Sequence, residues 1–120
     1  FDDAWLADEF IPRVAMRGGA IIEVRGASSA ASAATGAITH MRDWYQGTAE
    51  GDWVTVALPS DGSYGIPEGL MYGVPCTSDG TNWNRVEGLE ISAAQAERMK
   101  ISADDLEAER AAVKELGLLD

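Results

Sequence analysis

Residues 53–86, WVTVALPSDGSYGIPEGLMYGVPCTSDGTNWNRV, decide the fold, because turn residues separate three strand-like runs there. The runs are rich in branched and aromatic residues, which favour strands: Trp53–Leu58, Leu70–Thr77 and Trp83–Val86. Residues 59–63 and 78–82 contain the Pro, Asp, Gly and Ser that are typical of turns. This pattern predicts a small antiparallel sheet of three strands, in which Pro75 indicates an edge or a bulge.

Helical patterns precede the sheet. Asp2 or Asp3 can cap a first helix, along which apolar residues recur every four positions, at Leu6, Phe10 and Val14. Pro12 is expected to kink or interrupt this helix, because proline lacks the N–H that the helix needs. The short apolar run at residues 20–22 fits a strand as well as a helix.

A second helix is expected from Ala27 to about Tyr45. Its first half is almost entirely Ala and Ser, and such small side chains let a backbone or a ligand approach closely. Ile38, Met41 and Tyr45 are expected to continue a buried stripe, and Gly47 to end the helix.

A long helix is expected to close the chain. Ser92 and Gln95 form a capping box at its start, an interruption is possible near residues 101–102, and Gly117 ends it. The sequence therefore predicts an α+β fold with helices packed on a small twisted antiparallel sheet.

Length and charge limit the function. A chain of 120 residues has the length of one domain, and its 20 acidic against 9 basic residues give a net charge of −11. This charge argues against nucleic acid and against anionic membranes as partners. No apolar run is long enough to span a bilayer, and the acidic start does not resemble a signal peptide. The single cysteine, Cys76, fits a reducing compartment, so a cytoplasmic location is expected.

The sequence offers no complete active site, so no catalytic residue is assigned. It contains neither the dinucleotide-binding glycine fingerprint nor a phosphate-binding P-loop, and it has no zinc or calcium spacing. Ser28 and Ser29 are candidates for a nucleophile, but a continuous helix would place His40 roughly 18 Å from Ser28. The other interpretation of these serines is packing and capping at a helix start. Cys76 is expected to be a buried, unreactive thiol, and the four tryptophans to be core anchors.

Two stretches resemble one family specifically. The first is residues 17–34, RGGAIIEVRGASSAASAA, and the second is residues 51–54, GDWV, followed by residues 60–70, SDGSYGIPEGL. Both resemble the C-terminal part of NAD-dependent malate dehydrogenases, which belong to the lactate/malate dehydrogenase family. Residues 4–12, 87–91 and 115–118 fit the same family, so the resemblance covers essentially the whole chain. Gly19, Cys76 and the segment 92–97 depart from the family's usual pattern.

The resemblance implies hydride transfer between L-malate and NAD in the tricarboxylic acid cycle, with residues 1–120 as part of the catalytic domain. The NAD-binding domain, the catalytic histidine and the substrate-binding arginines lie upstream in the family, so this segment alone is expected to be inactive. The resemblance places Ser28 and Ser29 near the dicarboxylate substrate, and it implies a homodimer. A non-catalytic dimerisation or interaction module is the alternative, and a lactate dehydrogenase is a weaker one.

Overall fold

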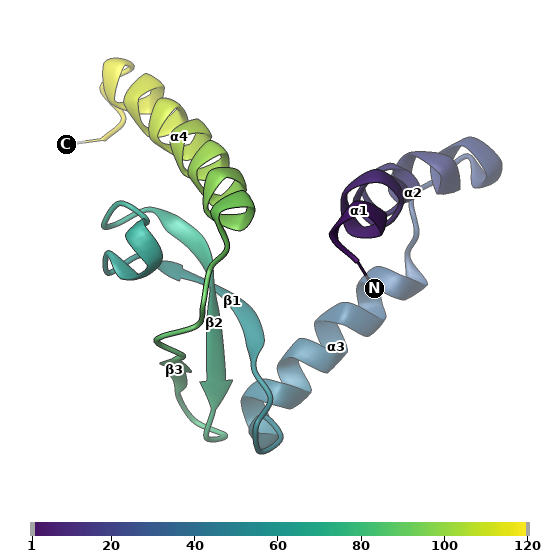
Figure 1. Cartoon of the computed structure of the whole chain (residues 1–120), viewed down its shortest axis with the longest axis horizontal. Helices are drawn as coiled ribbons and strands as arrows, with labels where there is room; N and C mark the ends of the chain where they lie inside the picture. The colour runs from purple at the N-terminus through teal and green to yellow at the C-terminus, as the bar shows by residue number, and fades with distance from the viewer. Residues whose placement is uncertain (1, 120) are drawn as a thin grey trace. The chain divides into compact units, whose positions relative to one another are not determined.

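The structure is a computed structural model that describes residues 2–119. It divides into two compact units, residues 1–42 and 43–120. The first unit is helical, and the second holds the sheet and the C-terminal helix (Figure 1). The α+β prediction is therefore confirmed.

The first helical stretch runs without a break through three segments: α1 (Asp3–Trp5), the π-helix η1 (Leu6–Phe10) and α2 (Ile11–Arg25). The Asp2 carboxylate accepts a hydrogen bond of 2.7 Å from the amide of Trp5 and caps the start, as predicted. The run at residues 20–22 is helical.

Pro12 does not interrupt this stretch, so the expected interruption is not found. Proline lies in the first turn of α2, where a missing N–H is tolerated, and the preceding turn is π-helical. The Ile11 amide donates to the carbonyl of Leu6, five residues back. The chain thus changes its hydrogen-bond pattern before the proline and continues as a helix.

The second helix, α3 (Ala31–Gln46), begins four residues later than predicted. Gly26 ends α2 in a left-handed conformation with a φ of 73°, which only glycine adopts without strain. Residues 27–30 then form the connection between the two helices.

The three strands pair in the order β1–β2–β3 and all pairs are antiparallel, as predicted. Their bounds are Val54–Pro59 for β1, Met71–Ser78 for β2 and Trp83–Arg85 for β3. Pro75 lies in the central strand and not at an edge. The Val86 amide donates to the Pro75 carbonyl at 2.9 Å, just beyond the end of β3. Because the pairing of β2 with β3 ends here, the missing N–H of Pro75 removes little hydrogen bonding from the sheet.

The core of the second unit has two parts. Val56, Val74 and Cys76 share one face of the sheet and are buried together. Ile66 and Leu70, from the loop between β1 and β2, pack with Ala103 of the C-terminal helix.

That helix, α4 (Ala93–Glu115), has the predicted capping box: Ser92 accepts from the Gln95 amide, and its own amide donates to the Gln95 side chain. It is not interrupted near residue 101. The Ser102 hydroxyl donates to the Arg98 carbonyl, four residues back, at 3.3 Å, so its hydrogen bond is made within the helix.

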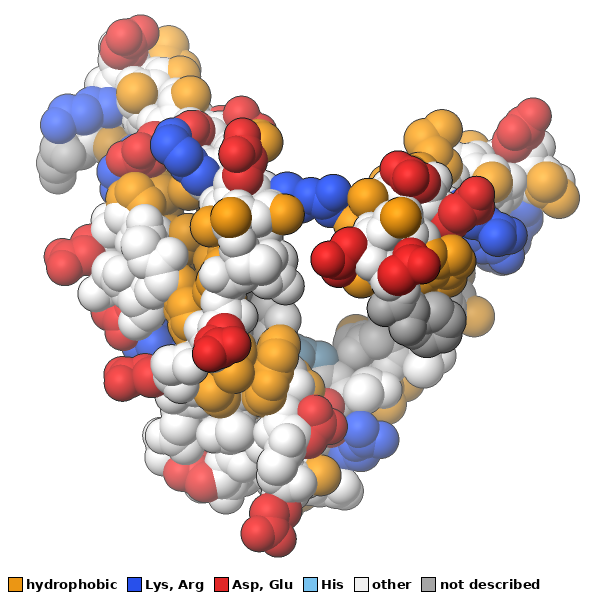
Figure 2. All heavy atoms as spheres, in the orientation of Figure 1, with side chains coloured by type: hydrophobic (Ala, Val, Ile, Leu, Met, Phe, Trp, Pro, Cys, Tyr) orange, Lys and Arg blue, Asp and Glu red, His pale blue; other side chains and the backbone are white. Residues whose placement is uncertain are grey.

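The predicted helical stripes are not buried in this chain (Figure 2). Val14 is 57% exposed and Ile38 is 69% exposed, because nothing else in the helical unit, residues 2–42, packs over these faces. The prediction that the four tryptophans are core anchors is wrong. Trp5, Trp44 and Trp53 are exposed, and Trp83 is a partly buried residue that packs against the core residues of the sheet. Within the described residues, no helix is long and apolar enough to cross a bilayer.

Candidate functional site

The connection between α2 and α3 carries the two candidate serines. Ser28 is exposed, whereas Ser29 is half-buried. The Arg25 guanidinium, at the end of α2, donates from Nη1 to the carbonyl oxygen of Ser28 at 3.2 Å. The Ser32 hydroxyl, in the first turn of α3, donates to the hydroxyl oxygen of Ser29 at 2.8 Å. The short connection is therefore held at both ends by side chains of the flanking helices.

The serines are not part of a nucleophilic pair. His40 is the tenth residue of α3, so about 13 Å of helix separates it from the connection at 1.5 Å per residue. A general base must lie within about 3 Å of the proton that it removes. His40 is therefore too far along the helix to activate the Ser28 and Ser29 hydroxyls.

Cys76 is a structural residue. It is completely buried among Val56 and Val74. Burial raises the pKa of its thiol, and the positive charge of Arg85 opposes this only in part. The neutral thiol is therefore the dominant form, which agrees with the expectation of a buried hydrophobic residue.

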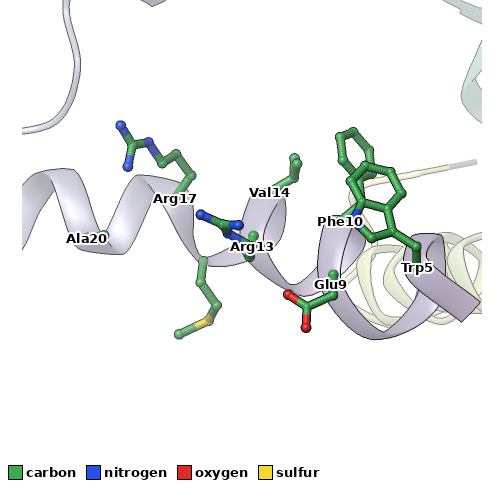
Figure 3. A pocket seen from close by; sticks show the side chains of 8 residues that line it. Trp5, Glu9, Phe10, Arg13, Val14, Arg17 and Ala20 are labelled. Atoms are coloured by element: carbon green, nitrogen blue, oxygen red, sulfur yellow. The ribbon is translucent and has the colours of Figure 1, made fainter. Parts of the chain in front are cut away.

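A groove of about 700 Å³ follows one side of α1–α2, and the sequence pattern alone did not reveal it (Figure 3). The rings of Trp5 and Phe10 lie together at one end, with centroids 5.3 Å apart. Glu9, Arg13 and Arg17 line it further along the helix. The four-residue spacing of Arg13 and Arg17 is the signal that could have indicated a charged face. The groove offers an apolar surface with charged sides, and it holds neither a histidine nor a cysteine for acid–base chemistry.

Two further cavities, of about 500 and 300 Å³, lie in the second unit between the β1–β2 loop, the sheet and α4. They share the side chains of Tyr64, Ile66, Ile91 and Met99. The Tyr64 hydroxyl donates to the Val86 carbonyl and is therefore engaged within the fold. Residues 2–119 contain no group of three or more His, Cys, Asp or Glu side chains that could hold a metal ion.

Comparison with known proteins gives a consistent result. Residues 1–116 match the family model described as the lactate/malate dehydrogenase, alpha/beta C-terminal domain. A malate dehydrogenase of Corynebacterium jeikeium is 66% identical over 118 residues, which are 98% of this chain and 36% of that protein.

Solved structures agree with this match. Malate dehydrogenase from Naegleria fowleri is 44% identical with a TM-score of 0.87, over 98% of this chain and 35% of that chain. Trichomonas vaginalis lactate dehydrogenase in complex with NADH and oxamate is 32% identical with a TM-score of 0.85, over 99% of this chain and 37% of that chain.

The chain thus spans about a third of the length of the relatives that it matches. The match covers both the helical unit and the sheet with its C-terminal helix, and so it accounts for every element described above. The chain belongs to the lactate/malate dehydrogenase family, and the part that it represents is the family's α/β C-terminal domain.

Proposed function

We propose that this chain is the C-terminal portion of the catalytic domain of an NAD-dependent malate dehydrogenase. The parent enzyme interconverts L-malate and oxaloacetate: a hydride leaves C2 of malate for the nicotinamide, and the proton of the hydroxyl is released. The observation that carries this proposal is the 66% identity to a curated malate dehydrogenase over 98% of the chain. A solved malate dehydrogenase, that of Naegleria fowleri, is 44% identical to this chain.

NAD is the proposed cofactor, held mainly by a dinucleotide-binding domain outside this chain. The Trichomonas relative was solved with NADH. This chain has no glycine-rich phosphate loop. When bound, the dinucleotide supplies the hydride chemistry, and the residues of this chain border the substrate.

Ser28 and Ser29 are the proposed substrate-proximal residues. Hydroxyls can donate hydrogen bonds to the carboxylates of a dicarboxylate. The connection that holds them is short, and the neighbouring side chains are small, so a ligand can approach closely. Their task is to bind and orient the substrate, and no proton transfer is assigned to them.

The isolated segment is proposed to be inactive, because hydride transfer from malate requires a base for the hydroxyl proton and a cationic clamp for the substrate. Within residues 2–119, His40 lies too far along α3 to be that base, and the Arg25 guanidinium already donates to the Ser28 carbonyl oxygen. The test is the loss of NADH absorbance on addition of oxaloacetate. It is measured with the 120-residue chain alone and with the chain joined to the N-terminal portion of the Corynebacterium jeikeium relative.

The expected result is no turnover by the chain alone and turnover by the joined protein. Turnover by the chain alone would refute the proposal that this segment is inactive. No turnover by a folded, joined protein would contradict the malate dehydrogenase function.

The same proposal includes a homodimer that acts in the cytoplasm in the tricarboxylic acid cycle. Its support in this chain is the exposed apolar surface of α2 and α3, where Val24 is 90% exposed. Large contiguous apolar patches on a protein surface usually mark a contact with a partner. The second candidate function is a non-catalytic dimerisation or interaction module, which the incomplete site favours. A reading frame without a dinucleotide-binding segment upstream of residue 1 would support the module.

A further inference from the structure

The Ser28 backbone is held by one side chain. Within residues 2–119, no backbone–backbone hydrogen bond involves residues 27–29, although these residues form most of the connection between α2 and α3, residues 27–30. The Arg25 guanidinium spans this link and donates to the Ser28 carbonyl oxygen at 3.2 Å. Removing the guanidinium would leave the Ser28 carbonyl without its one protein partner in the described chain.

The two serines of the link differ in what they can still bind. The Ser29 hydroxyl oxygen already accepts a hydrogen bond from Ser32 at 2.8 Å, and Ser29 is half-buried. Ser28 is exposed, and its hydroxyl has no protein partner among the described residues. Ser28 is thus the serine whose side chain is free for a ligand, while the Ser29–Ser32 contact stiffens the start of α3.

We propose that Arg25 is a positioning residue of the enzyme: it holds the Ser28 carbonyl and thereby fixes the backbone position from which the Ser28 hydroxyl reaches the dicarboxylate. This inference rests on the function proposed above, in which Ser28 lies beside the substrate. Arginine suits the task because its planar guanidinium is always charged and presents several donors in a fixed geometry. Its position in the last turn of α2 also places a positive charge at the end of the helix where carbonyls are free.

The first test uses the joined protein described above. The chemical shift of the Ser28 carbonyl carbon is measured by NMR in the natural sequence and in Arg25→Ala, Arg25→Lys and Arg13→Ala, because this shift responds to a donor at the carbonyl oxygen. Arg13 is a matched control, because it is an exposed arginine of the same helix and does not bond to the Ser28 carbonyl. We expect the shift to move in Arg25→Ala, to move less in Arg25→Lys and to stay unchanged in Arg13→Ala. An unchanged shift in Arg25→Ala would show that Arg25 does not hold the Ser28 carbonyl.

The second test uses the joined protein described above and compares Ser28→Ala, Ser29→Ala and the arginine variants. We expect Arg25→Ala and Ser28→Ala each to raise the KM for oxaloacetate about 3- to 10-fold, the effect of one hydrogen bond, while the KM for NADH stays within about twofold. Arg25→Lys should recover part of the loss. The increase should persist at about 0.5 M salt, because salt screens long-range attraction of a dicarboxylate but not a local hydrogen bond.

The outcomes separate the two proposals. If Ser28→Ala raises KM and Arg25→Ala does not, Arg25 is not a positioning residue. An Arg25→Ala effect that disappears at high salt would show charge attraction and would equally refute positioning. If Ser28→Ala leaves KM unchanged in an active enzyme, the substrate role of Ser28 fails, whereas an inactive joined protein refutes the malate dehydrogenase function itself.

Discussion

The phenol oxygen of Tyr64 donates to the carbonyl oxygen of Val86 at 2.6 Å, across 22 residues of sequence. The same oxygen accepts a weaker hydrogen bond from the Leu89 amide at 3.4 Å. Tyr64 thus joins the β1–β2 loop to the segment that leads from β3 into α4. It does so from a left-handed conformation with a φ of 55°, which is uncommon for a residue other than glycine. A strained backbone of this kind persists only where the surroundings hold it in place.

Replacing Tyr64 with Phe should lower the free energy of unfolding of the second unit by about 1–2 kcal/mol, because the partly buried Val86 carbonyl then loses its donor. Urea unfolding followed by tryptophan fluorescence measures this. Tyr45→Phe is the control, since Tyr45 is 81% exposed and should unfold like the natural chain. Equal urea midpoints for Tyr64→Phe and Tyr45→Phe would show that the Tyr64 bond contributes nothing.

Gly73 should not tolerate a side chain. A Cβ at this position would lie 2.9 Å from the Cγ2 methyl of Thr55 on the neighbouring strand, closer than side chains pack. Thr55 is branched at Cβ and cannot turn away freely. Gly73→Ala should therefore destabilise the sheet by about 1–3 kcal/mol in urea unfolding. Adding Thr55→Ser, which deletes the methyl, should restore much of the loss, and failure of this rescue would assign the loss to another cause.

Stability should decrease in acid partly through Asp61. The Ser63 hydroxyl and the Ser63 amide donate to its carboxylate and, with a smaller contribution from Arg85, hold its pKa below the usual 3.8, although partial burial opposes them. A pKa that is lower in the folded chain means that the contribution is present above pH 3.8 and is lost as the pH falls through the folded value. Urea midpoints measured from pH 7 to pH 2 should fall less in Asp61→Asn than in the natural chain.

Asp105→Asn is the control for the removal of one acidic side chain, because Asp105 is an exposed residue of α4. The Arg85 Nε atom is buried without a hydrogen bond in the described chain and lies 3.3 Å from the Asp61 Oδ2 atom. Asp61→Asn should therefore also be less stable at pH 7. An acid profile identical to the natural one would rule out Asp61 as a contributor.

Cys76 should resist thiol reagents until the sheet unfolds. Its side chain is fully buried, and burial raises the pKa of the thiol, so little thiolate is present at neutral pH. A colorimetric disulfide reagent should label the native chain at the rate of unfolding and the urea-unfolded chain within seconds. Rapid labelling of the native chain would contradict the closed core around Val56 and Val74.

Local chemistry along the sequence determined much of the fold. Branched residues and the Pro, Asp and Gly turns specified three antiparallel strands, and Ser92 with Gln95 specified the start of α4. These features depend on interactions between near neighbours, which a pattern of residue types expresses directly. The family resemblance at residues 17–34 indicated the same domain that the comparisons show.

Only the tertiary structure decided which apolar residues are covered and which polar groups meet. Val14 and Val56 belong to equally apolar patterns, yet Val14 is exposed and Val56 is buried, because a second strand and its neighbours pack over Val56 alone in this chain. In the same way, residue types do not reveal that Tyr64 reaches Val86 or that Asp61 lies beside Arg85. Such contacts join positions more than 20 residues apart, and their free energy depends on a geometry that exists only once the chain has folded.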